Sequence, residues 1–488
     1  MKYLWVILIV LFLWCIFSSK KRRQPIARQE GSVSEPQHSY TAISTSRRKS
    51  KRRIATSYVA SFPTDFQLTP EFSTTFDLME NSKRHLFITG KAGTGKSTLL
   101  QYFKEKTKKK IVVVAPTGIA AINIGGSTIH SFFRFPPRLV TRNDVRVIAN
   151  KRELFSSLDA VIIDEVSMVR ADIMDAIDYS LRINRNRPNE PFGGVQMILI
   201  GDLYQLEPVV ESELNDYFVD TFKSHFFFGA HVLSQLDLIQ VELQKVFRQT
   251  DPEFIGLLNK VHNNKVSQLD LRYLNKLHNP TATFSKDDLA ITLTSTNALA
   301  SEINQSRLDS LPSRDFYFDA FVSGEFDEKS FPTDKRLRLK QGAQIMMVKN
   351  DPNKQWVNGS LGVIQKLSQD SIKVSFGAYS CSVEPMTWEK IDYDYNPADR
   401  KIEPVVIGSF RQYPIKLAWA ITVHKSQGKT FDKVIIDLGN GAFAHGQAYV
   451  ALSRCRSFQG ILLRTPIKLS DIILDERVVD FLSRGNGT

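Results

Sequence analysis

Short runs of apolar, mostly β-branched residues recur along the first half of the chain and alternate with stretches of helical periodicity. They are residues 86–89 (LFIT), 111–115 (IVVVA), 160–164 (AVIID), 197–201 (MILIG) and 238–243 (LIQVEL). Continuous apolar runs separated by helices are typical of parallel strands that are buried on both faces. The pattern predicts an α/β fold built on a doubly wound parallel sheet.

The same texture returns in the second half, at residues 290–296, 433–438 and 460–465, and predicts a second α/β sheet. Between these runs, from about residue 340 to residue 412, short strands with Gly and Pro predict a small inserted β-barrel. We therefore expect a first sheet domain over residues 59–235. The second sheet domain is expected over 236–340 and 413–488, with the inserted barrel over 341–412.

The N-terminus has a different pattern. Residues 3–17 (YLWVILIVLFLWCIF) contain no polar interruption, and four basic residues follow at 20–23. The 15-residue run is short for a bilayer span, which needs about 20 residues, but no signal-peptide cleavage site follows it within segment 1–19 or directly after it. We interpret it as a membrane anchor that leaves the rest of the chain in the cytoplasm, because the basic residues follow the segment. A buried core helix and a misassigned start codon are the alternatives.

Composition adds little to this picture. The 488 residues suffice for about three domains. The net charge of +13 is concentrated at the start: residues 1–60 contain twelve Lys or Arg and two acids, against 52 and 49 in the rest. Residues 20–58 are therefore predicted to be a disordered basic linker, which would bind DNA, attract anionic lipid, act as a nuclear address or be merely solvated. The three widely spaced cysteines, which lack CxxC spacing, argue against a disulfide framework or a structural zinc site and fit a reducing compartment.

A glycine-rich loop carries the strongest chemical signal. Residues 90–97 (GKAGTGKS) fit the spacing G-x-x-x-x-G-K-[ST] between a strand and a helix, where backbone amides wrap phosphates. Lys96 would reach the β and γ phosphates of ATP, and the Ser97 hydroxyl would ligate Mg²⁺. The predicted nucleotide-binding residues are Gly90, Ala92, Gly93, Thr94, Gly95, Lys96, Ser97 and Thr98. A chance match is the alternative.

An acidic pair follows another predicted strand. Asp164 and Glu165 would lie at the carboxyl edge of the sheet, where α/β folds bind ligands. Asp164 suits a Mg²⁺ site, and Glu165 is placed to polarise the attacking water as a general base. The alternative is an acidic pair that merely closes the strand.

The next strand, residues 197–201, leads into a loop that brings Gln205 towards the γ-phosphate. An amide both donates and accepts hydrogen bonds, so Gln205 can report whether that phosphate is present. A structural turn is the alternative.

Two further segments offer contacts to nucleic acid. Hydroxyls and amides bind phosphates, and aromatic rings stack on bases irrespective of sequence. The candidates are Pro116, Thr117, His130 and Phe133 in residues 115–133, and His424, Lys425, Ser426 and Gln427 in residues 422–428. Phe132 and Phe133 would alternatively be core residues.

Taken in order, these motifs resemble those of superfamily 1B DNA helicases and, among them, the Pif1 family and its short bacterial members. The resemblance rests on GKAGTGKS, APTGIAAINIGGSTIHSFF, DEVSM, PFGGVQMILIGDLYQLEPV, VFRQ, VNGSLGV, and WAITVHKSQGKTFD through YVALSRC, and runs from about residue 64 to 482. One departure is Glu207, where the family usually has proline. The adenine-reading glutamine of the family has Gln67 as its nearest candidate.

The resemblance implies two RecA-like domains, an SH3-like barrel in the insert and a small wedge at about 131–150, which includes FRFPPR (133–138). It further implies two arginine fingers, Arg248 and Arg454, and places both candidate nucleic-acid segments on a single-strand path. To that path it adds Lys349, Asn350 and Asn358. The implied activity is ATP-driven 5′→3′ movement on single-stranded DNA with unwinding of forked or structured DNA, in replication, repair, recombination or telomere-type maintenance.

Two other functions use parts of the same sequence. A membrane-tethered DNA-binding protein would use the ATPase as a switch and would not separate strands. A small-molecule kinase would use the same phosphate loop, but it has no need of a second sheet with YVALSRC. The expected location is cytoplasmic, at a membrane if residues 3–17 anchor the chain, and nuclear or organellar locations stay open.

Overall fold

The computed structural model describes residues 53–54, 68–249, 251–285 and 288–485. The hydrophobic segment 3–17, nearly all of the linker 20–58, and Gln67 lie outside these ranges. Among the described residues, no helix has the length and apolar character that crossing a membrane requires.

The first domain is built on a six-stranded sheet whose order is β4-β3-β5-β6-β2-β7, with every pairing parallel. Its strands are β2 (His85–Gly90), β3 (Ile111–Ala115), β4 (Ser127–Thr128), β5 (Ala160–Ile163), β6 (Gln196–Ile200) and β7 (Leu238–Leu243). Its helices are α2 (Pro70–Asn81), α3 (Lys96–Lys106), α4 (Gly118–Asn123), α5 (Ile129–Phe133), α6 (Arg152–Ser157), α7 (Ala171–Arg185) and α8 (Asn215–Phe222).

Side chains on both faces of this sheet are buried. Successive strand residues point to opposite faces, so Leu86 and Ile88 pack with α2 and α3, whereas Phe87 packs in a separate core with α5, α6 and α7. The central strands β5 and β6 are buried at every position. The predicted doubly wound α/β sheet is thus confirmed.

The second domain contains a four-stranded parallel sheet of order β19-β8-β20-β21. Its strands are β8 (Ile291–Thr294), β19 (Ala420–Thr422), β20 (Val434–Asp437) and β21 (Ile461–Leu463). The helices that follow or precede them are α9 (Pro252–His262), α10 (Gln268–Leu274), α11 (Asn297–Asp309), α12 (Gln447–Leu452) and α13 (Glu476–Gly485). The second α/β sheet of the sequence analysis is therefore present.

The inserted region is entirely antiparallel and is split into several sheets. Five strands pair in the order β15-β14-β13-β12-β18, and the two longest strands form a separate hairpin, β16 and β17, whose second strand also pairs with β1 and β10. The strands are β1 (Arg53–Ile54), β9 (Phe316–Asp319), β10 (Phe321–Gly324), β11 (Arg336–Leu339), β12 (Gln344–Met347), β13 (Leu361–Leu367), β14 (Ile372–Ser375), β15 (Ser380–Val383), β16 (Met386–Asn396), β17 (Lys401–Gln412) and β18 (Ile415–Leu417). The predicted range 341–412 therefore mixes two sheets and omits β18, as well as β9, β10 and β11, which lie in the range assigned to the second sheet domain. An SH3-like barrel stays a prediction.

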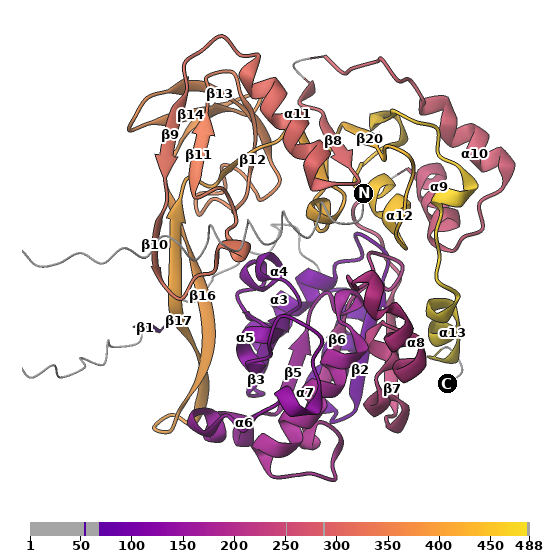
Figure 1. Ribbon diagram of the computed structural model, residues 1–488, viewed down its shortest axis with the longest axis vertical. Helices are drawn as coiled ribbons and strands as arrows, with labels where there is room; N and C mark the ends of the chain where they lie inside the picture. The colour runs from indigo at the N-terminus through magenta and orange to yellow at the C-terminus, as the bar shows by residue number, and fades with distance from the viewer. Residues whose placement is uncertain (1–52, 55–67, 250, 286–287, 486–488) are drawn as a thin grey trace, which may run out of the picture. The chain divides into compact units, whose positions relative to one another are not determined.

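The long hairpin reaches the first domain, and in Figure 1 it runs beside α4 and α5. The Tyr393 hydroxyl lies 3.3 Å from both the backbone nitrogen and the backbone oxygen of Val113 in β3. Lys151 forms an ion pair with Asp392, and its side chain is only 4% exposed. The insert is thus docked on the first domain through its β16 strand.

Three boundaries of the sequence analysis differ from the structure. Strand β7 pairs with β2, so the first domain extends beyond residue 235. Helix α13 belongs by sequence to the second domain, but Val478 and Leu482 lie in the core of the first, which local pattern does not reveal. In segment 131–150, Phe135 and Ile148 are buried in that same core, so part of the predicted wedge is a packed layer of the first domain.

The buried ion pair gives a stability prediction. Replacing Asp392 with alanine is expected to lower the free energy of unfolding in urea by about 3–5 kcal/mol, because Lys151 would be left as an uncompensated buried charge. The matched control is Asp327→Ala, which breaks the more exposed pair between Asp327 and Lys390 of the same hairpin and should cost about 1 kcal/mol or less. Equal losses in the two variants would contradict the buried character of the first pair.

Candidate active site at the junction of the two domains

The glycine-rich loop after β2 has the shape of a phosphate cradle. Gly93 and Gly95 have φ of 88° and 87°, a region that favours glycine. A Cβ at Gly93 would lie 2.5 Å from the Cβ of Arg248, so the glycine also permits that residue to approach. Lys96 begins α3 and donates to the loop carbonyls of Gly90 and Lys91, the latter at 3.1 Å. Its ammonium therefore lies over the loop that would hold the phosphates.

The acidic pair lies at the end of β5, as predicted. Asp164 is 7% exposed, and burial together with the charge of Glu165 raises its pKa to about 7. Glu165 adopts the left-handed conformation (φ 53°, ψ 43°), which is uncommon for a residue with a Cβ and concentrates at functional sites. Burial also raises the pKa of Glu165, while the charges of Lys96 and Arg454 act in the opposite direction.

The loop after β6 supplies two buried polar residues. Asp202 is 2% exposed and accepts a hydrogen bond from the Gln205 amide at 2.8 Å. Burial opposes ionisation of Asp202, but the nearby His262, the charge of Lys96 and the hydrogen bond from Gln205 prevail and lower its pKa to about 2. Gln205 also accepts from Gln427 of the second domain at 3.5 Å. Gln205 thus joins the acidic site to the other domain.

Both predicted arginine fingers come to this junction. Arg454, just after α12, is 1% exposed and donates to the carbonyl of Val450 at 2.9 Å and to the hydroxyl of Ser453 at 2.8 Å. Arg248 donates to the carbonyl of Ser453 at 3.4 Å. Burial, aided by the charge of Arg248, lowers the pKa of Arg454 to about 9. Two guanidinium groups are therefore held close together beside the acidic pair.

Two residues that the sequence analysis did not single out complete the junction. The Tyr449 hydroxyl of α12 accepts a hydrogen bond from the Ala92 amide of the glycine-rich loop at 3.0 Å. His262, at the end of α9, is 6% exposed and lies 3.7 Å from Asp202 and in ring contact with Tyr449. Tyr449 stands inside the YVALSRC motif, which was the available signal, whereas His262 lies in no motif.

The residues present fit a nucleotide with a divalent cation. The glycine-rich loop and Lys96 form the phosphate cradle, and Asp164 has a raised pKa that a neighbouring cation would lower again. Ser97 and Thr98 occupy the first turn of α3, and Ser97 is exposed. Asp164 and Ser97 are thus the residues that would hold the cation.

The candidate nucleic-acid residues are less uniform. Phe133 is 2% exposed and stacks on Phe135, so it is a core residue and its predicted contact with a base is wrong for this structure. The Ser426 hydroxyl is buried and donates to the Val423 carbonyl at 2.6 Å, so it holds its own turn. Thr117 and Lys425 are exposed.

The remaining candidates lie at partly exposed positions or bind one another. Asn350 accepts from the Asn358 amide at 2.7 Å, and Asn358 contacts Lys429 at 2.7 Å and Asn123 of α4 at 3.5 Å. Lys349 lies over the Trp388 ring. Pro116, His130 and His424 are partly exposed. Asn358 of the insert therefore contacts α4 in the first candidate segment and Lys429, which follows the second candidate segment.

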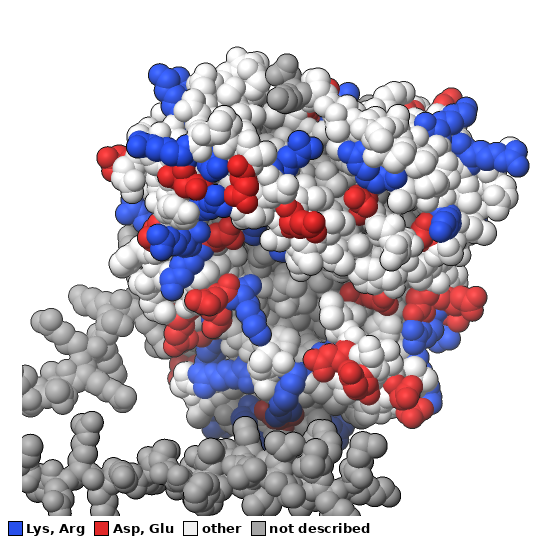
Figure 2. Space-filling view, turned by 45° about the horizontal axis from the view of Figure 1, so that its top comes forward, with Lys and Arg blue, Asp and Glu red and all other residues white. Residues whose placement is uncertain are grey.

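Surface charge does not by itself mark a nucleic-acid interface. On the face shown in Figure 2, Lys and Arg are interspersed with Asp and Glu, without one large patch of a single sign. This agrees with the nearly balanced charge of residues 61–488. On this face, therefore, charge alone gives no sign of a nucleic-acid interface.

Comparison with known proteins gives consistent matches. Residues 67–271 match the family described as PIF1-like helicase, and residues 328–367 match the DNA helicase Pif1 2B domain. The ATP-dependent DNA helicase Pif1 of Bdellovibrio bacteriovorus is 30% identical, over 87% of this chain and 93% of its own length. The ATP-dependent DNA helicase PIF1 of Xenopus laevis is 33% identical over 82% of this chain, which spans only 62% of that longer protein.

Among solved structures, Bacteroides sp. Pif1 in complex with ADP-AlF4 is 40% identical and superposes with a TM-score of 0.80, covering 87% of this chain and 98% of that one. The same Bacteroides protein bound to single-stranded DNA gives a TM-score of 0.63 over 86% and 99% of the two chains.

Proposed function

The chain belongs to the Pif1 family of helicases, and on that premise we propose that it is an ATP-driven motor that moves 5′→3′ along single-stranded DNA. We further propose that it unwinds forked or structured DNA, in replication, repair, recombination or telomere-type maintenance. The observation that carries the proposal is that the glycine-rich loop of the first domain contacts the second: the Ala92 amide donates to the Tyr449 hydroxyl of α12 at 3.0 Å, and Arg454 follows that same helix.

Hydrolysis follows from the placement of the buried charges. Glu165 polarises the attacking water, and Lys96, Arg248 and Arg454 stabilise the charge that develops on the transferring phosphoryl group. A bound Mg²⁺, held by Asp164 and Ser97, would neutralise charge on the phosphate oxygens. Because these groups come from both domains, nucleotide binding and release change how firmly the domains are held together.

Gln205 is suited to transmit that change. It hydrogen-bonds to Asp202 beside Lys96 and to Gln427 in the segment that also holds His424 and Lys425. A change at the phosphate therefore reaches one of the candidate DNA contacts through two side-chain amides. Breaking one base-pair step costs about 1.4 kcal/mol on average, which is small beside the free energy of one hydrolysis per base.

DNA binding along Thr117 would require the insert to move. A Cβ on Gly118 would lie 2.4 Å from the Ser330 hydroxyl, so the segment around Ser330 covers the start of α4. The higher TM-score with the nucleotide-bound Bacteroides structure than with its DNA-bound form supports this interpretation. The insert would leave α4 when the strand enters.

The direction is tested with forked duplexes that carry a single-stranded tail on one strand only. With the purified full-length chain, ATP and Mg²⁺, we expect strand displacement from the 5′-tailed fork, none from the 3′-tailed fork, and none with Lys96→Ala. DNA-stimulated hydrolysis without displacement on either fork would instead favour the ATPase switch. Strand displacement from the 3′-tailed fork alone would show that the chain moves 3′→5′ and would contradict the proposed direction.

Attachment to a membrane is a separate proposal and rests on residues 3–17, whose apolar run precedes four basic residues. The full-length chain is expected to sediment with membranes and resist carbonate extraction, whereas a variant that lacks residues 1–19 should appear in the supernatant. If carbonate extracted the full-length chain and the shortened variant equally, the anchor proposal would be refuted and the motor proposal would be unaffected.

A further inference from the structure

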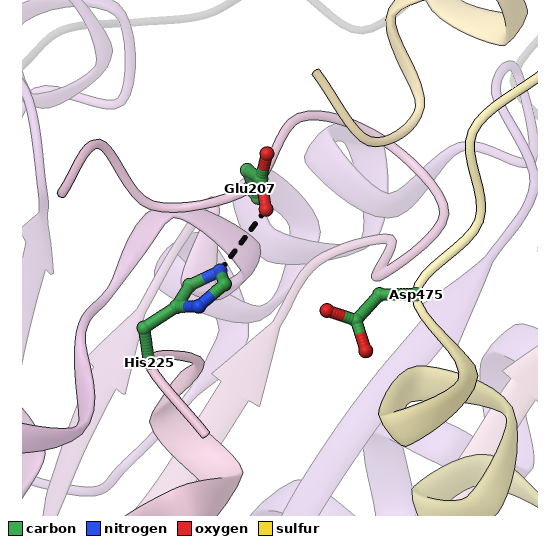
Figure 3. Close-up of side chains that lie close together, drawn as sticks. All are labelled: Glu207, His225 and Asp475. Atoms are coloured by element: carbon green, nitrogen blue, oxygen red, sulfur yellow. Dashed lines mark hydrogen bonds and ion pairs between the residues drawn. The ribbon is translucent and has the colours of Figure 1, made fainter. Parts of the chain in front are cut away.

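Within the part of the chain that the structure describes, one group of metal-ligand side chains lies outside the nucleotide site. It consists of Glu207, His225 and Asp475, whose ligand atoms lie within 4.8 Å of one another. In Figure 3, Asp475 faces the hydrogen-bonded pair of Glu207 and His225 from the C-terminal segment. The Glu207 carboxylate lies 3.0 Å from His225 Nε2. We call these three residues the Glu–His–Asp cluster.

A fourth residue, His445, holds two of these ligands in place. Its ring is 2% exposed: Nε2 lies 2.7 Å from the Leu203 carbonyl oxygen and Nδ1 accepts from the Asp475 amide at 3.0 Å. Its backbone amide donates to Glu207 Oε1 at 3.3 Å. The orientation of both carboxylate-bearing segments is therefore set before any ligand binds, which is how supporting residues preorganise metal sites.

The proposed helicase activity does not account for this arrangement. Glu207 is the position at which the chain departs from the proline that is usual in the family, and neither His225 nor Asp475 belongs to a nucleotide or DNA motif. Arg477 pairs with the Asp475 carboxylate at 2.5–3.2 Å. The Nε2 atom of His225 and the Oε2 atom of Glu207 remain directed at each other.

We propose that the Glu–His–Asp cluster binds a divalent transition-metal ion of the Zn²⁺ class. Imidazole nitrogen with two carboxylates suits Zn²⁺ and Co²⁺, while Mg²⁺ prefers all-oxygen octahedral surroundings. Bonds of about 2.0–2.2 Å to a tetrahedral ion place ligand atoms about 3.4 Å apart. The Glu207–His225 separation of 3.0 Å would open by about 0.4 Å, and Asp475 would approach by up to about 1.4 Å and exchange one of its Arg477 contacts for the ion. A fourth position would be left to water.

A metal ion here would join segments whose relative movement the motor needs. Glu207 lies two residues after Gln205, and Asp475 lies between the second sheet and α13, which packs in the first core. Holding them together would fix the Gln205 loop against the C-terminal connection. This consequence rests on the proposed function, whereas the binding itself does not.

Binding is measured by titrating Co²⁺ into the full-length chain, freed of Mg²⁺ and nucleotide, and following visible absorption. We expect Co²⁺ to bind at one site and to be displaced by Zn²⁺. The bound Co²⁺ should show d–d absorption bands and no thiolate charge-transfer band. Glu207→Gln and His225→Gln should each weaken it at least about tenfold, the scale on which ligand-shell changes act. The matched control, His231→Gln, removes an exposed His–Asp175 pair at 2.7 Å and should leave the affinity unchanged.

An unchanged Co²⁺ affinity in Glu207→Gln, or the absence of a site in the wild type, would overturn the proposal. Thermal unfolding gives a second readout: Zn²⁺ should raise the melting temperature of the wild type and of His231→Gln, but not of Glu207→Gln. In DNA-stimulated hydrolysis, Zn²⁺ should lower kcat of the wild type and spare Glu207→Gln. If Zn²⁺ bound tightly but left the rate of ATP hydrolysis unchanged, only the inference that the ion fixes the Gln205 loop would be overturned. If the chain did not hydrolyse ATP at all, the proposed motor function would be refuted. The Co²⁺ titration would still decide whether the metal site exists.

Discussion

Arg454→Ala is expected to lower kcat of DNA-stimulated ATP hydrolysis by about 10³–10⁵-fold, the range over which arginine fingers act. The guanidinium lies beside Arg248 and acts on the charge of Glu165, so its removal takes positive charge from the place where the phosphoryl group becomes more negative. Steady-state hydrolysis over a range of ATP and DNA concentrations measures kcat separately from KM. The KM for ATP should change far less than kcat.

The neighbouring Arg456 provides the control. It pairs with Asp432 at 3.2 Å with its side chain 63% exposed, and Arg456→Ala should leave kcat within about twofold of the wild type, since exposed ion pairs contribute little. Arg454→Lys separates charge from geometry: a lysine cannot reproduce the several simultaneous hydrogen bonds of the guanidinium, so most of the loss should remain. Full activity of Arg454→Lys would mean that only a positive charge is required. Thermal unfolding of all three variants distinguishes lost chemistry from lost fold.

Much of the nucleotide site was predictable because its signals are local. A glycine-rich loop, a strand ending in Asp164-Glu165 and a second strand leading to Gln205 each occupy a few consecutive residues. In a parallel sheet the carboxyl ends of all strands meet at one edge. Knowing the strand type was therefore enough to bring Lys96, Glu165 and Gln205 together.

Contacts that depend on distant packing were not predictable in this way. The aromatic ring of Phe133 could stack on a base or pack in a core, and which of the two occurs depends on what packs over it. His262 belongs to the site only because α9 brings it close to Asp202, which is 60 residues away in sequence. Periodicity reports neither of these placements.

The insert shows the same division. Its Gly- and Pro-rich texture predicted short strands, and the structure has such strands from β12 to β15, but also the much longer β16 and β17. The sequence did not reveal that β16 and β17 form a hairpin of their own, because the pairing partner of a strand is not encoded in its alternation. Docking through Lys151 and Asp392 joins residues 241 positions apart.

Glu165→Gln is expected to lower kcat of ATP hydrolysis by about 10²–10⁴-fold, the contribution of a general base, while nucleotide binding is retained or tightened. Glutamine has nearly the same shape and removes a negative charge from beside the phosphates. Single-turnover hydrolysis measures the chemical step, and equilibrium binding of a fluorescent ATP analogue measures affinity. The control Glu105→Gln, at an exposed position on α3, should leave both unchanged.

The pH dependence of the same variant distinguishes a base from a merely structural acid. Burial raises the pKa of Glu165, so in the wild type the ionised base is lost, and hydrolysis falls, as pH decreases through that raised value. Glutamine cannot be protonated in this range, so the residual activity of Glu165→Gln should lack this acid limb. If the variant kept both the wild-type rate and the acid limb, the base would have to be sought elsewhere; the adjacent Asp164, whose pKa burial raises to about 7, would be the next candidate.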